Sequence, residues 1–312
     1  MKKYILLLIA SLSYADTVSV VLENDAIIGK DNHYTNGFYA TWMSEDKPNF
    51  PDILSFIDLE QKNIAMSFSH AIFTPQNKRL ATADLNDLPY AGYANLNFLT
   101  YKSSSNFFHE AGVNIGMVGP STQADSLQKG FHSLIGHEKP KGWDTQLGDD
   151  FIYGASYNVG YKTDPLTLGE LSLDATTNLR ADLGNFYRGA LAGANIRLSS
   201  IPLDSFSTEG NFIGTNESLL LNHKEVKSLQ WAISFGLLYN KFDYFYVIDK
   251  AKDEGYNVSS IDYTFGQKLS LDLFYGSLKT SFYLKSLDIN HDGGSSSNEK
   301  TGGISLTWKW DR

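Results

Sequence analysis

The chain has 312 residues, a formal net charge of −9 at pH 7 and no cysteine. Without cysteine, neither a disulfide framework nor a thiolate metal site is possible, and the acidic balance argues against general nucleic-acid binding. Aromatic residues make up 13% and charged residues 20% of the chain, which is typical of strands that alternate between lipid and a wet interior. A soluble, secreted all-β domain has a similar composition, so composition alone leaves both classes open.

The first segment has the features of a secretory signal peptide. Met1-Lys2-Lys3 precedes an apolar run from Tyr4 to Leu12 and a small-x-small site at Ser13-Tyr14-Ala15. The run is shorter than the about 20 residues that a membrane-spanning helix needs. We therefore expect residues 1–15 to be a cleaved signal peptide and residues 16–312 to be exported in a Gram-negative cell.

Strands are expected along nearly all of the remaining chain, because apolar residues alternate there with small or polar ones. The first and last strands are clear examples, with outward-facing residues at Val18, Val20, Leu22, Ile304, Leu306, Trp308 and Trp310. The expected strands span residues 17–24, 35–43, 62–70, 89–101, 107–117, 150–163, 166–180, 187–198, 227–247, 257–273, 277–289 and 301–310.

The predicted fold class is therefore all-β: one transmembrane antiparallel β-barrel of about 12 strands. An even number of strands returns both ends of the barrel to the periplasm, and closure leaves no unpaired edge in lipid. Two connections, 44–61 and 199–226, are too long for periplasmic turns. Either they fold over the periplasmic mouth or the strand count is wrong there.

One segment, residues 121–135, predicts a short helix in an extracellular loop. Its apolar stripe consists of Ala124, Leu127, Phe131, Leu134 and Ile135. Thr122 and Asp125 have the spacing of a capping box, and Gly136 is a stop signal. Gln128 and His132 share a neighbouring polar face. The plain alternative is a lid over the barrel mouth without chemistry.

The three outer connections that follow the odd-numbered strands carry the candidate chemistry. Asn24, Asp25 and Thr35 offer oxygen atoms that suit a hard cation such as Ca²⁺. Lys78 and Arg79, in the second connection, can pair with phosphate. In the third connection, His132 can accept a proton from water near neutral pH, and Glu138 adds a carboxylate. Together these groups favour an ester hydrolase for an anionic lipid.

Each of these residues also has a plainer interpretation. Asn24-Asp25 at a strand end is common turn chemistry, a helical histidine is often structural, and Lys78-Arg79 can simply face water. His33, His137 and His291 have no argument beyond their residue type. The Gly-x-Ser-x-Gly and His-Glu-x-x-His signatures are missing from the sequence.

Two motifs resemble one known family, the lipid A 3'-O-deacylases of the outer membrane. Glu23-Asn24-Asp25, followed by Tyr34-Thr35-Asn36-Gly37, is similar to that family's opening signature. Gln128 and His132, followed by residues 135–139 and Trp143, are similar to its loop helix and the turn after it. The resemblance extends over the mature chain in length and strand number, but its specificity lies in residues 23–37 and 128–143.

The resemblance implies a twelve-stranded barrel that removes 3'-linked acyl chains from lipid A in a Ca²⁺-dependent reaction, with the active site between barrel wall and loop helix. His132 would be the general base, and Gln128 would orient the site. Asp25 would hold the calcium, with Asn24, Thr35 and Glu138 as further ligands or their neighbours. Lys78 or Arg79 would bind a glucosamine phosphate. We expect a monomer in the outer membrane whose partners are lipopolysaccharide and membrane lipids.

The sequence departs from the family pattern at two places. Lys30 replaces a small polar residue of the first loop, which puts the sugar contacts in doubt, and the chain ends on Trp310-Asp311-Arg312 instead of a terminal aromatic residue. Two other functions stay open. One is an outer-membrane phospholipase, for which Lys78 and Arg79 would be dispensable; the other is a porin or adhesin without catalysis.

Overall fold

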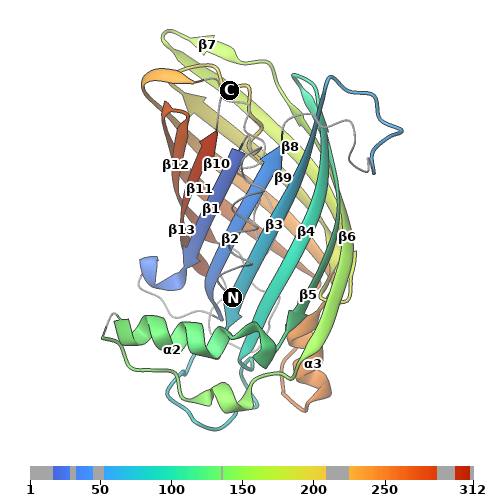
Figure 1. The fold of residues 1–312 in the computed structure, drawn as a ribbon, viewed down its shortest axis with the longest axis vertical. Helices are drawn as coiled ribbons and strands as arrows, with labels where there is room; N and C mark the ends of the chain where they lie inside the picture. Colours follow the sequence, from blue (N-terminus) through green and yellow to red (C-terminus); the bar gives the residue numbers. More distant parts are fainter. Residues whose placement is uncertain are drawn as a thin grey trace, which may run out of the picture.

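The computed structural model describes residues 17–28, 33–44, 53–134, 136–208, 225–286 and 299–309. These residues form an antiparallel β-barrel with short helices at one end (Figure 1). The predicted signal peptide and Trp310 lie outside the described residues. No helix in the described part of the chain is long and apolar enough to cross a membrane.

Twelve strands close the barrel. They are β1 (Thr17–Asn24), β2 (Tyr34–Ser44), β3 (Gln61–Phe73), β4 (Ala91–Ser103), β5 (Phe107–Val118), β6 (Asp150–Lys162), β8 (Leu171–Gly184), β9 (Tyr187–Ser199), β10 (Val226–Phe245), β11 (Tyr263–Gly276), β12 (Leu278–Ser286) and β13 (Lys300–Lys309). Neighbours in this order are hydrogen-bonded, and β13 pairs with β1. The predicted all-β barrel is confirmed, and its closure leaves no strand edge for lipid.

The strand expected over residues 166–180 is wrong as a single element. A short strand, β7 (Leu166–Leu168), pairs with the first residues of β8. The rest of β8 pairs directly with β6. Leu168 faces Leu171 across the turn, and Gly169 between them has φ 65°. Glycine tolerates this left-handed conformation because it lacks a Cβ. The glycine therefore marks a hairpin turn in an otherwise strand-like pattern.

Alternation along the strands separates a lipid-type outer surface from a polar lumen. On β1, Ser19 and Glu23 are buried inside while Leu22 is exposed outside. Buried ion pairs between nearby strands line the lumen, including Lys285 with Glu23 at 3.0 Å and Arg197 with Asp174 at 2.8 Å. Because an unpaired buried charge is costly, these pairs allow charged side chains to fill the interior.

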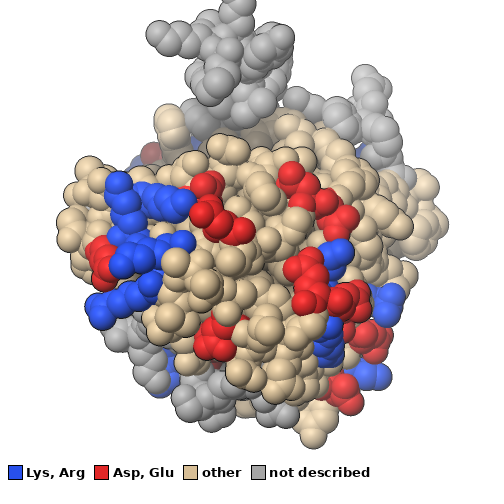
Figure 2. Space-filling view, turned by 90° about the horizontal axis from the view of Figure 1, so that it is seen from below, with Lys and Arg blue, Asp and Glu red and all other residues tan. Residues whose placement is uncertain are grey.

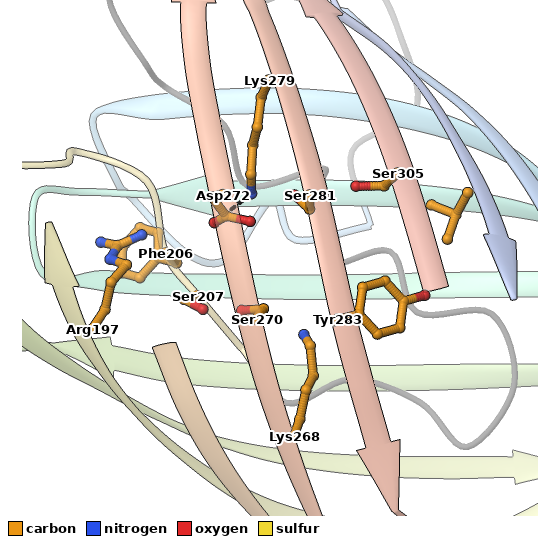
Figure 3. Close-up of a pocket in the computed structure, with 11 residues that line it drawn as sticks. Arg197, Phe206, Ser207, Lys268, Ser270, Asp272, Lys279, Ser281, Tyr283 and Ser305 are labelled. Carbon is orange, nitrogen blue, oxygen red and sulfur yellow. Dashed lines mark ion pairs between the residues drawn. The ribbon is translucent and has the colours of Figure 1, made fainter. Parts of the chain in front are cut away.

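A small cavity lies in this lumen. Figure 3 shows serine hydroxyls on its wall and Lys279 paired with Asp272, a contact of 3.1 Å. Lys268 also lines the cavity, and its ammonium lies 5.2 Å from the centre of the Tyr283 ring. The cavity thus presents hydroxyls and cations whose charges are partly balanced within the wall.

The other end of the lumen, where the short helices lie, is filled by an apolar core. The helix α3 (Tyr246–Asp253) follows β10 there and contributes Val247, Ile248 and Ala251, all fully buried. Inward-facing aromatic residues of the strand ends, including Phe73 and Phe242, belong to the same cluster. A porin needs an open lumen, so this core argues against the porin alternative.

The helix α3 replaces the end of an expected strand. The sequence predicts strands over 227–247 and 257–273, but β10 ends at Phe245 and β11 begins at Tyr263. Aromatic and β-branched residues around Tyr246 favour a strand locally. Asp249 overrides this preference by accepting a hydrogen bond from the Phe245 backbone N–H at 3.0 Å, which caps the first turn.

The two long connections lie at the opposite end of the barrel, and the second of them enters the lumen there. Lys102 donates a hydrogen bond to the Ile57 carbonyl at 2.6 Å, and Lys162 donates to the Leu203 carbonyl at 2.8 Å. Lys162 faces inward and holds the second segment in the lumen, whereas Lys102 shares the outward face of β4 with Leu96 and Phe98 and holds the first segment against the outer wall. Residues 45–52 and 209–224 of these connections lie outside the described residues.

The predicted loop helix is confirmed as α2 (Ala124–Leu134), preceded by the 3-10 turn η3 (Pro120–Thr122). The capping box is wrong, because the Thr122 hydroxyl donates to the Gly119 carbonyl at 2.7 Å. The glycine stop is confirmed. Gly136 has φ 72°, and the His137 N–H donates to the His132 carbonyl at 2.9 Å, which is the Schellman pattern.

Candidate functional site

All eight predicted site residues lie at the end of the barrel that carries α2 and α3, which we call the α2 rim (Figure 1). Asn24 ends β1 and Asp25 begins the 3-10 helix η2 (Asp25–Ile28). Thr35 is the second residue of β2. The other five residues come from the next two connections of this rim, so three consecutive loops supply the site.

The loop with α2 packs against the outer wall of the barrel. On β3, Met66 and Phe68 are exposed outward, whereas His70 and Ile72, which follow on the same face, are buried. His70 Nε2 donates to the Thr122 carbonyl at 3.1 Å. Ile72 packs in a cluster with Tyr90, Ala124 and Trp143, the last from the 3-10 helix η4 (Gly142–Thr145). The helix therefore covers barrel wall that would otherwise face outward.

His132 is half-buried on α2, and a backbone carbonyl fixes its ring. Its Nδ1 lies 2.6 Å from the carbonyl oxygen of Glu138. A carbonyl only accepts hydrogen bonds, so Nδ1 carries the proton and Nε2 is the basic nitrogen of the neutral ring. This is the arrangement by which proteins orient a histidine that acts as a base.

Gln128 lies one turn before His132 and is held by Trp143. The indole Nε1–H donates to Gln128 Oε1 at 2.8 Å inside the protein. Since an indole N–H can only donate, this contact fixes which end of the amide is oxygen. The amide nitrogen of Gln128 is buried and has no hydrogen-bond partner among the described residues. An unpaired buried amide costs about 1–3 kcal/mol, and such a cost is typical of a group reserved for a ligand.

Asp25 and Lys78 join the first loop to the second. The Asp25 carboxylate is almost fully buried and lies 3.8 Å from Lys78 Nζ. The hydroxyls of Thr35 and Thr74 are 2.7 Å apart, which makes a second link. The pairing of β2 with β3 is irregular at Thr35, a feature often found beside functional sites.

Asn24 has the turn role that its sequence position also allowed. Its Oδ1 accepts a hydrogen bond from the Ala26 N–H at 2.7 Å, which starts η2. On the neighbouring strand β2, its register partner is Asn36. The side chain therefore shapes the turn that presents Asp25, and a catalytic role for Asn24 stays a prediction.

Glu138 is exposed and paired with two cations. Its carboxylate lies 2.9 Å from Lys141 Nζ and 3.2 Å from Arg79 Nε. The hydrogen bond and charge of Lys141, together with the charge of Arg79, lower the pKa of Glu138. The structure thus brings the Glu138 carboxylate to Arg79 and its carbonyl to His132. It does not pair Glu138 with Asp25, and its role as a calcium ligand stays a prediction.

The donor atoms at the rim could form a calcium site, but one with few charged ligands. Asp25 is a buried carboxylate beside a turn and a threonine hydroxyl, and such oxygen donors are those that Ca²⁺ prefers. Among the described residues, no group of three or more His, Cys, Asp or Glu could hold a metal ion. With one carboxylate at Asp25, main-chain and side-chain amide oxygens would have to complete the coordination. The residues present fit Ca²⁺ on these terms.

The buried cluster around His33 was not predicted from the sequence. His33 Nε2 lies 2.7 Å from Asp87, and Nδ1 lies 2.5 Å from Glu299. Burial lowers the pKa of His33, but the hydrogen bonds and charges of Asp87 and Glu299 outweigh it and raise the pKa to about 9. The cluster ties together the starts of β2 and β13 and the loop after β3. Because 266 residues separate His33 from Glu299, no local motif could have predicted it.

Figure 2 shows the α2 rim seen along the barrel. Lysine and arginine side chains gather on the left of this face, the side on which α2 ends in Figure 1. The cations on and beside α2 are the half-buried Lys129 and the exposed Arg79, Lys139 and Lys141. Acidic residues predominate on the right, where α3 carries Asp249 and Asp253. The site therefore lies on the basic side of the rim.

The comparison with known protein families identifies the chain. A family model described as outer membrane protein LpxR matches residues 3–310. This chain belongs to the LpxR family. Membership places it in the outer membrane, in agreement with its closed barrel and apolar outer surface. No match was found among curated protein sequences.

The fold agrees with this LpxR assignment. LpxR from Salmonella typhimurium superposes with a TM-score of 0.78 at 17% identity, over 94% of this chain and 100% of that chain. The β domain of the Bordetella autotransporter BrkA gives a TM-score of 0.45 at 8% identity, over 94% of this chain and 97% of that one. The second value is too low to support an argument. The first supports the shared architecture of an LpxR barrel.

Proposed function

We propose that this chain is a hydrolase that removes 3'-linked acyl chains from lipid A in the outer membrane, in a Ca²⁺-dependent reaction. The observation that carries the proposal is the orientation of His132, whose Nδ1 is held by the Glu138 carbonyl at 2.6 Å. This contact leaves Nε2 as the base, on a helix that packs against the outer wall of the barrel. The family likeness of residues 23–37 and 128–143 supports the same assignment.

In the proposed reaction, His132 Nε2 takes a proton from a water molecule whose oxygen attacks the carbonyl carbon of the ester. The same proton then passes to the sugar 3'-oxygen as its bond to that carbon breaks. The products are a fatty acid and a lipid A with a free 3'-hydroxyl. A positioned histidine typically contributes about 10²–10⁴-fold to such a step.

Gln128 would serve the same reaction through its buried amide. Its oxygen is engaged by Trp143, so its N–H groups are the end available to a ligand. Such a donor can orient the attacking water or stabilise the developing oxyanion. One donor to an oxyanion is typically worth about 10²–10³-fold in rate.

Asp25 would hold the calcium, with oxygen atoms of Asn24 and Thr35 as further ligands or their neighbours. When bound, Ca²⁺ supplies positive charge that stabilises the oxyanion. Glu138 would contribute through its carbonyl to His132 and through its carboxylate to Arg79. In this proposal the two roles of Glu138 do not require it to bind the metal.

Arg79 is better placed than Lys78 to bind a glucosamine phosphate. The Arg79 side chain is 80% exposed, whereas that of Lys78 is 12% exposed and lies beside Asp25. Guanidinium groups also pair with phosphate in a bidentate manner. We therefore assign phosphate recognition to Arg79 and a position beside the metal to Lys78. Cleavage of the signal peptide at residue 15 and a monomeric state belong to the same proposal.

The test is mass spectrometry of lipid A from cells that produce wild-type protein, His132→Ala or Asp25→Asn, incubated with Ca²⁺ or with a chelator. Loss of the 3'-linked acyl mass only for wild type with Ca²⁺ supports the reaction, the base and the cofactor together. Unchanged lipid A in every condition, with a folded barrel, contradicts the proposal. Release of fatty acid from glycerophospholipid in the same cells would instead identify a phospholipase.

A further inference from the structure

The helix α2 carries its large apolar side chains on the outside. Leu127 is 56% exposed, Phe131 is 51% exposed and Leu134 is 83% exposed, whereas the polar Gln128 is 4% exposed. A helix that packs on a soluble protein buries its apolar stripe. The apolar flank of α2 must therefore have a partner other than the barrel itself.

The register of the barrel wall indicates what that partner is. Leu22, Phe38, His70, Ala94, Met117 and Phe151 are successive register partners on the outer face of β1 to β6. At the ends of this row, Leu22, Met117 and Phe151 are exposed apolar residues of the surface that faces lipid. In its middle, His70 and Ala94 are polar or small, and His70 lies beneath η3.

The helix thus covers the one stretch of this row that lacks large apolar side chains. Gly92, one position closer to the rim than Ala94 on the same face, allows the close approach, since a Cβ there would lie 2.6 Å from the Ala124 Cβ. Leu127, Phe131 and Leu134 then supply the apolar surface that His70, Ala94 and Gly92 lack. The lipid-facing surface of the barrel continues over α2.

Charged residues border this flank as they do in helices that lie at a membrane surface. Lys129 lies on α2, and Lys139, Lys141 and Arg79 are exposed in the segments beside its C-terminal end. Apolar residues on one face and lysines on another are the composition of interfacial helices. The basic side of the rim in Figure 2 is the side on which α2 ends.

We infer that α2 lies in the outer leaflet of the membrane, with Leu127, Phe131 and Leu134 in contact with lipid acyl chains. The inference goes beyond the proposed hydrolysis and does not depend on it. It would place His132, on the neighbouring flank, at the level where the chains of a lipid meet its headgroup. The helix would then be a fixed part of the membrane-contacting surface.

The test uses single cysteines carrying a nitroxide label, because the natural chain has no cysteine. Leu127→Cys and Leu134→Cys report on the apolar flank. Ser133→Cys is the matched control on the same helix, since Ser133 is also exposed. Leu22→Cys is the reference for a strand position that faces lipid. Each labelled barrel is reconstituted in phosphatidylcholine vesicles, and relaxation by oxygen is compared with relaxation by a water-soluble nickel complex.

The expected result is a ratio of oxygen to nickel accessibility at positions 127 and 134 that is several-fold above that at 133 and close to that at 22. Equal ratios at 127, 133 and 134 would overturn the inference. Protection of 127 and 134 from both reagents, with spin–spin broadening, would place a second copy of the chain there and would also overturn it. Faster electrophoretic migration of unboiled samples verifies that each variant has folded.

Discussion

The two helices of the α2 rim are both short and amphipathic, yet they place their apolar side chains oppositely. In α3, Val247, Ile248 and Ala251 are fully buried in the core that fills the lumen. In α2, Leu127 and Leu134 are exposed and Gln128 is buried. This difference shows that α3 stabilises the barrel by packing into its core. By contrast, α2 places polar groups against the wall and apolar groups toward its surroundings.

The largest expected effect separates the two helices by the same substitution. Ile248→Asp puts a carboxylate into the apolar core and should prevent folding, because an unpaired buried charge costs more than about 4 kcal/mol. Leu134→Asp changes an exposed residue and should leave the barrel folded in detergent. The measurement is the migration of unboiled protein on electrophoresis. Equal folding of both variants would remove the contrast between α2 and α3.

A smaller effect is expected from the buried polar flank of α2. Gln128→Ala should lower kcat for deacylation about 10²-fold, because it removes a donor to the reacting groups. Trp143→Phe keeps an aromatic ring against Tyr90 but loses the N–H that orients Gln128. It should lower kcat about tenfold, the value of one hydrogen bond, with little change in KM.

The control for this pair is Lys252→Ala on α3, which lies at the same rim and takes no part in the proposed site. It should leave kcat unchanged in the same assay of acyl release. If Trp143→Phe changed kcat no more than Lys252→Ala does, the role of Trp143 would be packing alone.

The smallest effect concerns pH and the His33 cluster, which joins the starts of β2 and β13 to the loop after β3. The pKa of His33 is raised from 6.5 to about 9, which corresponds to on the order of 3 kcal/mol of coupling to the folded state. A raised histidine pKa stabilises the folded state fully below about pH 6.5, and the stabilisation is lost as pH rises through 9. Protease cleavage within residues 74–90 should therefore increase several-fold between pH 6.5 and pH 10.

The variant His33→Gln provides the comparison. It leaves Asp87 and Glu299 without a cation between them, so cleavage of this segment should be raised already at pH 6.5. Its remaining pH dependence should be flat relative to that of the wild type. A wild-type chain with the same flat profile would contradict a role for His33 in holding the rim.

Strand alternation made most of the barrel predictable, because each strand has one lipid face and one polar face. Leu22, with Ser19 and Glu23 on the other side, is an example in which the pattern alone gave the orientation. The pattern failed where local chemistry overrode it. Gly169 turned one expected strand into a hairpin, and Asp249 capped a helix within a run of strand-forming residues.

The candidate site was predictable in its members but not in its contacts. Family likeness and the order of the loops brought His132, Gln128 and Asp25 to one rim. The carbonyl that fixes the His132 ring, the Trp143 N–H that orients Gln128 and the pairing of Glu138 with Arg79 depend on loop folding. The sequence also did not predict which way the apolar stripe of α2 faces, since a helical pattern does not say whether protein or lipid covers it.

The most direct test of the account compares two neighbouring histidines in purified, folded barrels. His132 and His137 have ring centroids 6.1 Å apart, but only the His132 ring is assigned the role of base. With lipid A and Ca²⁺, His132→Ala should lower the rate of 3'-acyl release by at least about 10²-fold, and His137→Ala should stay within a few-fold of the wild type. Near-normal acyl release by His132→Ala, or an equal loss in both variants, would contradict the account.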